Sequence, residues 1–193
     1  MSDPTYVSSG QFRADLEALF GPLVVREEPD PVEDWMQSAL QRLAAPVRAE
    51  VEALLTLHLE FELPELCRLR YSAFCTVADQ YECDEIGLVD EFSWHISGDA
   101  LAEQIKILME GVEIFNDQGN PFVLVASTGV YHFYDDPAEV RLLCDDLGAY
   151  LRVLVAVQGA ASGATPRDEA RAILERTITG HRYESYLTRG LDT

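Results

Sequence analysis

The chain has 193 residues, of which 48% are hydrophobic and 25% are charged, a composition typical of a globular protein rather than of a disordered or low-complexity chain. Acidic residues outnumber basic ones by 34 to 14, which gives a formal net charge of -20. This charge repels phosphate backbones and anionic lipid, so we expect no nucleic-acid partner and no membrane partner. The length suits a single α+β domain, placed at residues 1–164, with a helical appendage at 165–193.

The N-terminal residues lack a basic start followed by an apolar stretch, and no segment reaches the roughly 20 apolar residues that span a bilayer. We therefore expect a cytoplasmic protein. In that reducing compartment the four cysteines are expected to be free thiols. Cys67, Cys75 and Cys83 recur every eight residues. Zinc sites use closer ligand pairs, so we expect no metal.

Helical patterns fill most of the N-terminal half. Apolar residues at helical spacing predict a first helix over residues 8–20. After an acidic, proline-containing connector at 26–35, two further stripes predict a helical pair up to about residue 59, with Pro46 in the first turn of the second helix. The pattern of residues 61–89 is compatible with helix or strand, and we favour a helix.

The apolar period changes after a helix predicted at about 99–110. Three short runs of β-forming residues within 112–134, separated by turn residues, predict a three-strand antiparallel meander. Asp136 and Pro137 then resemble a helix start, which predicts a helix over 137–157.

A last helix is predicted to open at Thr165 and Pro166. The fold class is therefore α+β: a helix-rich N-terminal half, a three-strand antiparallel meander and C-terminal helices.

The sequence has no phosphate-binding loop, no nucleophile elbow and no helical zinc-hydrolase motif. We expect no cofactor and assign no catalytic residue. Neighbouring carboxylates could hold a divalent cation, but the loop spacing of a calcium site is missing, so a solvated acidic face is the favoured interpretation. These carboxylates are Asp84 with Glu85, Asp90 with Glu91, Asp135 with Asp136, and Asp145 with Asp146. An enzyme of unrecognised class with a carboxylate-lined site remains the alternative.

Residues 111–155 resemble the SUKH superfamily. A strand ends near "F…D.GN", a "..G.VY" strand follows, and a helix of the "…YL..L" type comes next. The matching positions are Phe115, Asp117, Gly119, Asn120, Phe122, Gly129, Val130, Tyr131, Tyr150 and Leu151. The resemblance implies a mostly antiparallel sheet in an α+β fold, and a bacterial immunity protein that binds and blocks a toxin.

We therefore expect a non-enzymatic protein-binding module whose partner is a protein, such as a basic toxin domain. The candidate partner-binding residues form an acidic, aromatic-bearing surface near the meander: Asp117, Tyr131, Tyr134, Asp135 and Asp136. Strand alternation places Tyr131 and Tyr134 on opposite faces, so one of these two tyrosines is expected in the core. The sequence leaves the oligomeric state open.

Overall fold

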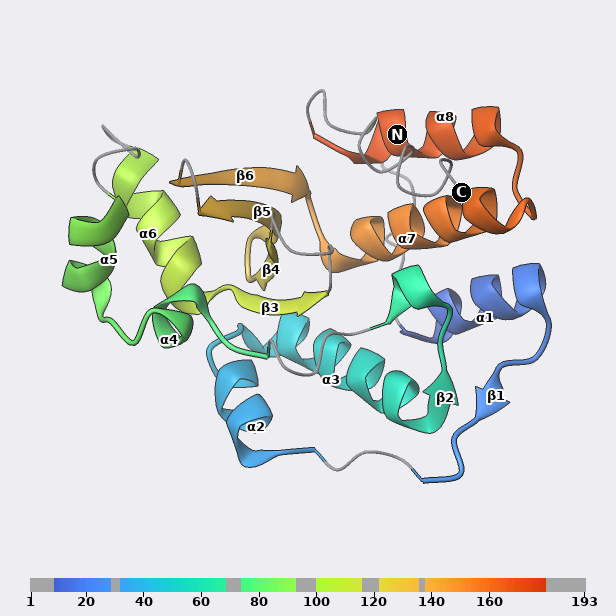
Figure 1. The fold of residues 1–193 in the computed structure, drawn as a ribbon, viewed down its shortest axis with the longest axis horizontal. Coiled ribbons are helices and arrows are strands. Elements are labelled where there is room, and N and C mark those ends of the chain that lie inside the picture. Colours follow the sequence, from blue (N-terminus) through green and yellow to red (C-terminus); the bar gives the residue numbers. More distant parts are fainter. Residues whose placement is uncertain are drawn as a thin grey trace. The chain divides into compact units, whose positions relative to one another are not determined.

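The computed structural model describes residues 9–28, 32–68, 74–92, 100–115, 122–135 and 138–179. The chain divides into two compact units: unit 1 comprises Met1–Pro31, Glu50–Arg68 and Leu143–Thr193, and unit 2 comprises Val32–Ala49 and Leu69–Leu142. The elements in chain order (Figure 1) are α1 (Ser9–Phe20), β1 (Val24–Val25), α2 (Asp34–Leu40), α3 (Ala45–Glu60), β2 (Phe61–Glu62), η1 (Glu65–Cys67), α4 (Val77–Gln80), α5 (Glu85–Phe92), α6 (Ala100–Glu110), β3 (Val112–Phe115), β4 (Phe122–Ala126), β5 (Gly129–Asp135), β6 (Ala138–Cys144), α7 (Leu147–Ser162) and α8 (Arg167–Thr177). The predicted α+β class is confirmed, with a helix-rich N-terminal half, an antiparallel sheet and two C-terminal helices.

The helices predicted in the first 60 residues are present. Helix α1 buries Phe12 and Leu16, four residues apart on one face. Helices α2 and α3 form the predicted pair, and Pro46 lies in the first turn of α3, where its missing N–H costs no hydrogen bond.

The helix favoured over residues 61–89 is confirmed only in part. The described part of this range holds strand β2, the short 3-10 helix η1, helix α4 and the first half of α5. Pro64 precedes η1, and Thr76 starts α4 with a capping box, so the chain changes direction at both points.

The four-stranded antiparallel sheet has the order β3-β4-β5-β6 and belongs to unit 2 except for Leu143 and Cys144, the last two residues of β6. In the register of its central pair, Leu124 opposes Tyr131 and Val123 opposes His132. The predicted meander is therefore confirmed for β3, β4 and β5. The turn residues 116–120 that the sequence assigns between β3 and β4 lie outside the described residues.

The predicted start of the helix at residue 137 is wrong, because residues 138–144 form the fourth strand of the sheet, β6, and only the second half of the predicted range 137–157 is helical. Val140 and Leu142 pack on the core, while Glu139 and Arg141 alternate with them and form an ion pair. That period of two is a strand pattern. Helix α7 begins ten residues later, at Leu147, where the carboxylate of Asp146 caps it by accepting a hydrogen bond from the Ala149 N–H at 2.7 Å.

The core of unit 2 lies on the face of the sheet that carries Tyr131. Helices α4, α5 and α6 supply Val77, Ala78, Leu88, Phe92, Ile105, Ile107 and Leu108, which pack against Leu124, Ala126, Tyr131, Phe133 and Val140 of the strands. Phe133 is the centre of the aromatic packing: its ring lies 5.4 Å from that of Phe92 and 5.8 Å from that of Phe122. Such ring pairs add to the area that they bury.

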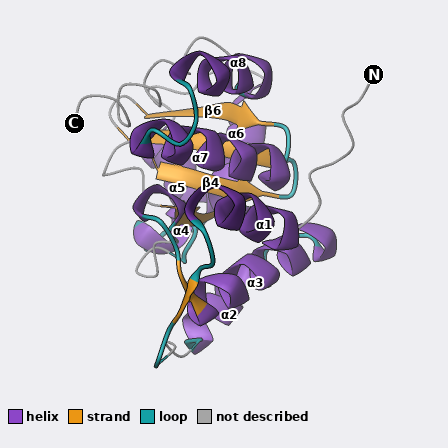
Figure 2. Ribbon diagram, turned by 90° about the vertical axis from the view of Figure 1, so that its right-hand side faces the viewer, coloured by secondary structure: helices purple, strands orange, loops and turns teal. Residues whose placement is uncertain are grey.

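Unit 1 is organised around α7, whose buried residues include Tyr150, Leu151 and Val153. Helices α1 and α8 and the turn η1 all pack on α7, and Figures 1 and 2 show α7 and α8 side by side. Helix α8, the described part of the predicted C-terminal appendage, buries Ala170 and Leu174. None of the helices within the described residues is long and apolar enough to cross a membrane.

Candidate functional site

The structure separates the two tyrosines of the predicted surface, as the strand alternation requires. Tyr131 is 7% exposed and belongs to the core cluster of unit 2 together with Phe133. Its hydroxyl lies 2.9 Å from the Thr128 hydroxyl. Tyr131 is therefore the tyrosine of the pair that lies in the core, where it packs within unit 2.

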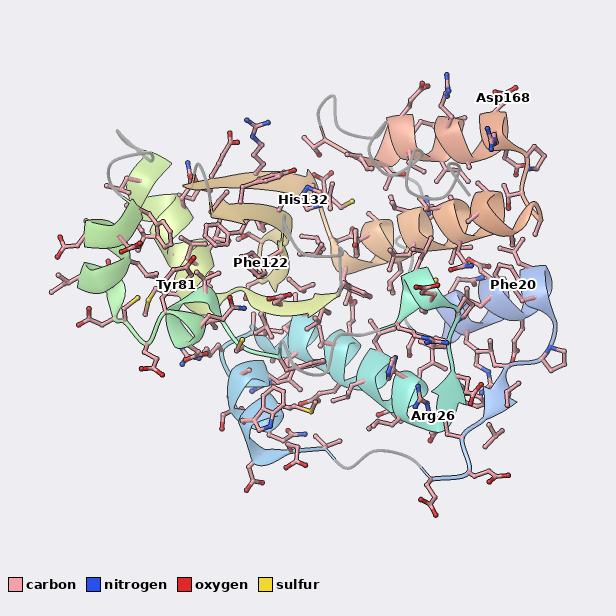
Figure 3. The ribbon with its side chains drawn as sticks, viewed as in Figure 1. Phe20, Arg26, Tyr81, Phe122, His132 and Asp168 are labelled. Carbon is pink, nitrogen blue, oxygen red and sulfur yellow. The ribbon has the colours of Figure 1, made fainter. Side chains whose placement is uncertain are left out.

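Tyr134 is half-buried and lies beside His132, one of the buried polar residues of the described chain. The two rings meet edge to face with centroids 5.9 Å apart, and the Tyr134 hydroxyl lies 3.5 Å from His132 Nδ1. Figure 3 labels His132 on β5. The other predicted residues are not placed: Asp117 and Asp136 lie outside the described residues, and the side chain of Asp135, which ends β5, does too.

A different acidic surface is fully described, on α4, α5 and the turn between them. Residues 79–91 contain six acids and no lysine or arginine. We define the α4–α5 surface by its exposed side chains after α4: Tyr81, Glu82, Asp84, Glu85, Ile86, Asp90 and Glu91. This surface combines negative charge with two large side chains that contact solvent, Tyr81 at 39% exposure and Ile86 at 70%.

Local hydrogen bonds fix the backbone of the α4–α5 surface. Thr76 accepts a hydrogen bond from the Asp79 N–H at 3.1 Å, and the Asp79 carboxylate accepts one from the Thr76 N–H at 3.1 Å. Arg42, two residues after the end of α2, lies 2.7 Å from the same carboxylate, so the charge of Asp79 is used within unit 2. Asp84 then opens α5 by accepting a hydrogen bond from the Gly87 N–H at 2.9 Å.

The two large exposed side chains differ in how firmly they are held. The ring of Tyr81 (labelled in Figure 3) meets the buried ring of Phe92 edge to face at 5.3 Å, which orders Tyr81 while part of it faces water. Ile86 lies on α5 four residues before Asp90, so these two side chains share one face of the helix. An ordered aromatic ring next to an exposed aliphatic group is the usual composition of an interface centre.

The turn between α4 and α5 holds a strained residue. Glu82 has a φ of 50°, in the left-handed region, and it is the one non-glycine residue with positive φ in the described chain. A residue with a Cβ loses roughly 1 kcal/mol in that conformation. Strained positions of this kind cluster at functional sites.

The carboxylates of the α4–α5 surface also affect the thiol of Cys83, which lies between them in the sequence. Burial, and after it the negative charges of Asp84 and Glu91, raise the pKa of the Cys83 thiol. A raised pKa keeps the thiol protonated, and the thiolate is the reactive form. The carboxylates of the surface therefore oppose a nucleophilic role for Cys83.

A buried carboxylate lies on the sheet beneath α4. Glu113 of β3 is 1% exposed, and its Oε2 accepts a hydrogen bond from Gln80 Nε2 at 2.7 Å. The Glu113 N–H donates to the Cys75 carbonyl at 3.0 Å, which ties β3 to the segment before α4. Glu113 thus links α4 to β3.

Within the described ranges, no three His, Cys, Asp or Glu side chains are arranged to hold a metal ion. Comparisons of the chain with family models, with curated proteins and with solved structures find no match. The SUKH resemblance therefore depends on the motifs of residues 111–155.

Sequence reasoning treated the carboxylates at 84–85 and 90–91 as a solvated face and did not select Tyr81 or Ile86. The signal present in the sequence is the run of six acids without a base, interrupted by Tyr81 and Ile86. The missing information is the exposure of these two side chains, which tertiary packing decides.

Proposed function

We propose that this protein is a non-enzymatic binding module that recognises a basic protein through the α4–α5 surface. The observation that carries the proposal is the exposure of Tyr81 and Ile86 within residues 79–91, a segment that has six acids and no arginine or lysine. Aromatic and large aliphatic groups supply the contact energy of an interface, and surrounding charges supply steering and selectivity. Together they suit a partner that presents apolar pockets within a positively charged surface.

The partner class follows from the resemblance of residues 111–155 to the SUKH superfamily, which implies an immunity protein that neutralises a bacterial toxin. A net charge of -20 supports this role, because a strongly acidic protein meets a basic toxin domain faster than a neutral one does. Tyr134, Asp135, Asp136 and Asp117 stay candidates for a second part of the same contact.

The experiment pairs the full chain with the protein encoded by the neighbouring gene and measures association in rising salt. We expect the association rate to fall with ionic strength, and the double variant Asp90→Lys/Glu91→Lys to slow it about tenfold or more. Ile86→Lys should mainly speed dissociation, since it removes a contact at the centre of the surface.

A matched control places the same change of charge on α8, as Asp168→Lys/Glu175→Lys; Asp168 is labelled in Figure 3. This control should change the rate less than the α5 variant. Equal effects of the two double variants would show that total charge, and not the α4–α5 surface, drives association. Asp135→Lys/Asp136→Lys tests the meander end in the same assay, and turnover of a small substrate by the isolated chain would replace the binding function with an enzymatic one.

A further inference from the structure

The two-stranded ribbon of unit 1, β1 with β2, exposes apolar side chains on both of its faces. Val24 and Val25 are 61% and 66% exposed. Successive side chains of a strand point to opposite faces, so neither face of β1 is covered. Phe20, at the end of α1 and labelled in Figure 3, is 37% exposed and precedes the ribbon by four residues. Burying β1 against another chain would therefore be favourable.

The backbone of β1 also has an open edge. Val25 opposes Phe61 in the antiparallel register, and the Arg26 N–H donates to the Glu60 carbonyl at 2.9 Å. Hydrogen-bonded and non-hydrogen-bonded pairs alternate along such a ladder, so the N–H and C=O of Val25 point away from β2. In the residues that the structure describes, the ribbon consists of β1 and β2 alone, and Figure 1 shows β1 at its outer edge.

Acidic side chains surround the ribbon. Glu62 lies opposite Val24, Glu60 precedes Phe61 on the other strand, and both glutamates are exposed. Exposed Glu27 and Glu28 follow β1. A strand that adds to the edge at Val25 would thus pass a set of carboxylates.

The arginines close to the ribbon are engaged within unit 1. Arg13 Nε lies 3.0 Å from Glu17 Oε1, and its guanidinium lies 4.2 Å from the centre of the Phe61 ring. Arg26 Nε donates to the Phe61 carbonyl at 3.1 Å; Figure 3 labels Arg26 beside β2. These contacts direct the charges of Arg13 and Arg26 toward β2, and Arg68 Nε donates to the carbonyl of Leu63, the residue after β2, at 2.9 Å. The exposed glutamates are therefore the charges beside β1.

We propose that β1 accepts an extended segment of a partner protein in which lysine or arginine alternates with apolar residues. The segment adds as a third strand: its backbone bonds to the N–H and C=O of Val25, its apolar side chains cover Val25 on one face, and its cations lie on the opposite face, which carries Val24 and Glu62. A second copy of this chain is a poor occupant, because its own glutamates would lie against those of the first copy. The inference shares no residue with the α4–α5 surface and stands or falls separately from it.

The test uses a fluorescent peptide in which valine alternates with lysine, titrated with the full chain and followed by fluorescence polarisation. A peptide in which glutamate replaces lysine serves as the charge control. We expect the lysine peptide to bind and the glutamate peptide to bind at least about tenfold more weakly, as expected when like charges face each other across a strand pair.

Two variants test the edge itself. Val25→Pro removes the outward N–H and keeps the bonds to β2, while Val24→Lys/Val25→Lys replaces the apolar contacts with like charge; each should weaken peptide binding about tenfold or more. Val32→Lys, at an exposed valine of unit 2, should leave binding unchanged. Circular dichroism and thermal melting check that each variant is folded.

Three outcomes overturn the inference: no binding of the lysine peptide, equal binding of the glutamate peptide, or binding that both ribbon variants leave intact. Concentration-dependent dimerisation of the natural chain that Val24→Lys/Val25→Lys abolishes would also overturn it, by identifying a second copy as the occupant. Because Ile86→Lys should not affect peptide binding, failure here and failure of the proposed function are distinguishable.

Discussion

The sheet of unit 2 and the ribbon of unit 1 use the same residue type with opposite results. Val123, Val125 and Val130 of the sheet are at most 1% exposed, whereas Val24 and Val25 of the ribbon are more than half exposed. The sequence motifs are alike, since each is a short β-branched run next to turn residues. The difference shows that β-forming residues specify extended backbone, while the surrounding elements decide whether a strand becomes core or contact surface.

The largest expected contrast between these strands is in solvent access to a thiol. Burial, and after it the charges of Asp146 and Asp145, raise the pKa of Cys144 in β6, and this side chain is fully buried. A cysteine introduced as Val25→Cys should be alkylated on the order of 1,000-fold faster than Cys144, since access to Cys144 requires unfolding or opening of its surroundings. Intact-protein mass spectrometry over time measures both rates, with denatured protein as the reference. Similar rates would show that Cys144 is accessible or that the ribbon is covered.

Shortening a core side chain should separate sheet from ribbon next most clearly. Phe133→Ala empties the site between Phe92 and Phe122 and should reduce the free energy of unfolding by about 3–5 kcal/mol. Val25→Ala, in the ribbon, should change it by no more than about 0.5 kcal/mol. Urea denaturation followed by circular dichroism measures both. A loss at Val25 comparable to that at Phe133 would mean that β1 belongs to a packed core.

A smaller effect is expected from removing the hydrogen bond between Gln80 and the buried Glu113 of the sheet. Gln80→Ala removes a donor from the buried carboxylate of Glu113 and should cost about 1–3 kcal/mol. The double variant Gln80→Ala/Glu113→Leu should recover part of that loss, because it removes the buried carboxyl group along with its partner. Gln37→Ala, on the exposed side of α2, is the control. No difference between Gln80→Ala and Gln37→Ala would show that the Glu113 contact adds nothing to stability.

The smallest expected effect concerns pH. Burial, and after it the charge of Asp146, raise the pKa of Glu50 above its ordinary value of 4.5. Between those two pKa values the folded protein holds a proton that the unfolded chain has released, so stability falls as pH rises through this window. Glu50→Gln should remove this fall and slightly raise stability at neutral pH. Melting temperatures across the window compare the two proteins.

The change of apolar period along the sequence correctly predicted strands β3, β4 and β5. Strand β6 was not predicted, because the residues just before it resemble the start of a helix. Residues 112–115, 122–125 and 130–134 alternate or run apolar between turns, and all three are strands. Asp136 and Pro137 resemble a helix start, yet β6 follows, because Val140 and Leu142 complete the core of unit 2. Pairing with β5 is a tertiary effect that no local pattern contains.

The candidate site was predictable in its charge and not in its position. Alternation predicted that one of Tyr131 and Tyr134 lies in the core, without saying which, and composition indicated an acidic surface. The exposure of Tyr81 and Ile86 depends on how α4 and α5 lie on the sheet, and helical periodicity alone does not give it. The α4–α5 surface therefore lies in a part of the chain, residues 61–89 and the end of α5, for which the sequence did not predict the separate short helices.

The left-handed backbone of Glu82 bears on how this protein would respond to selection. A glycine at this position would relieve the strain, so directed evolution for heat resistance alone should favour Glu82→Gly. The same change deletes one carboxylate of the α4–α5 surface. Libraries selected for heat resistance and libraries selected for partner capture should therefore diverge at residue 82, with glycine enriched in the first and an acidic residue retained in the second.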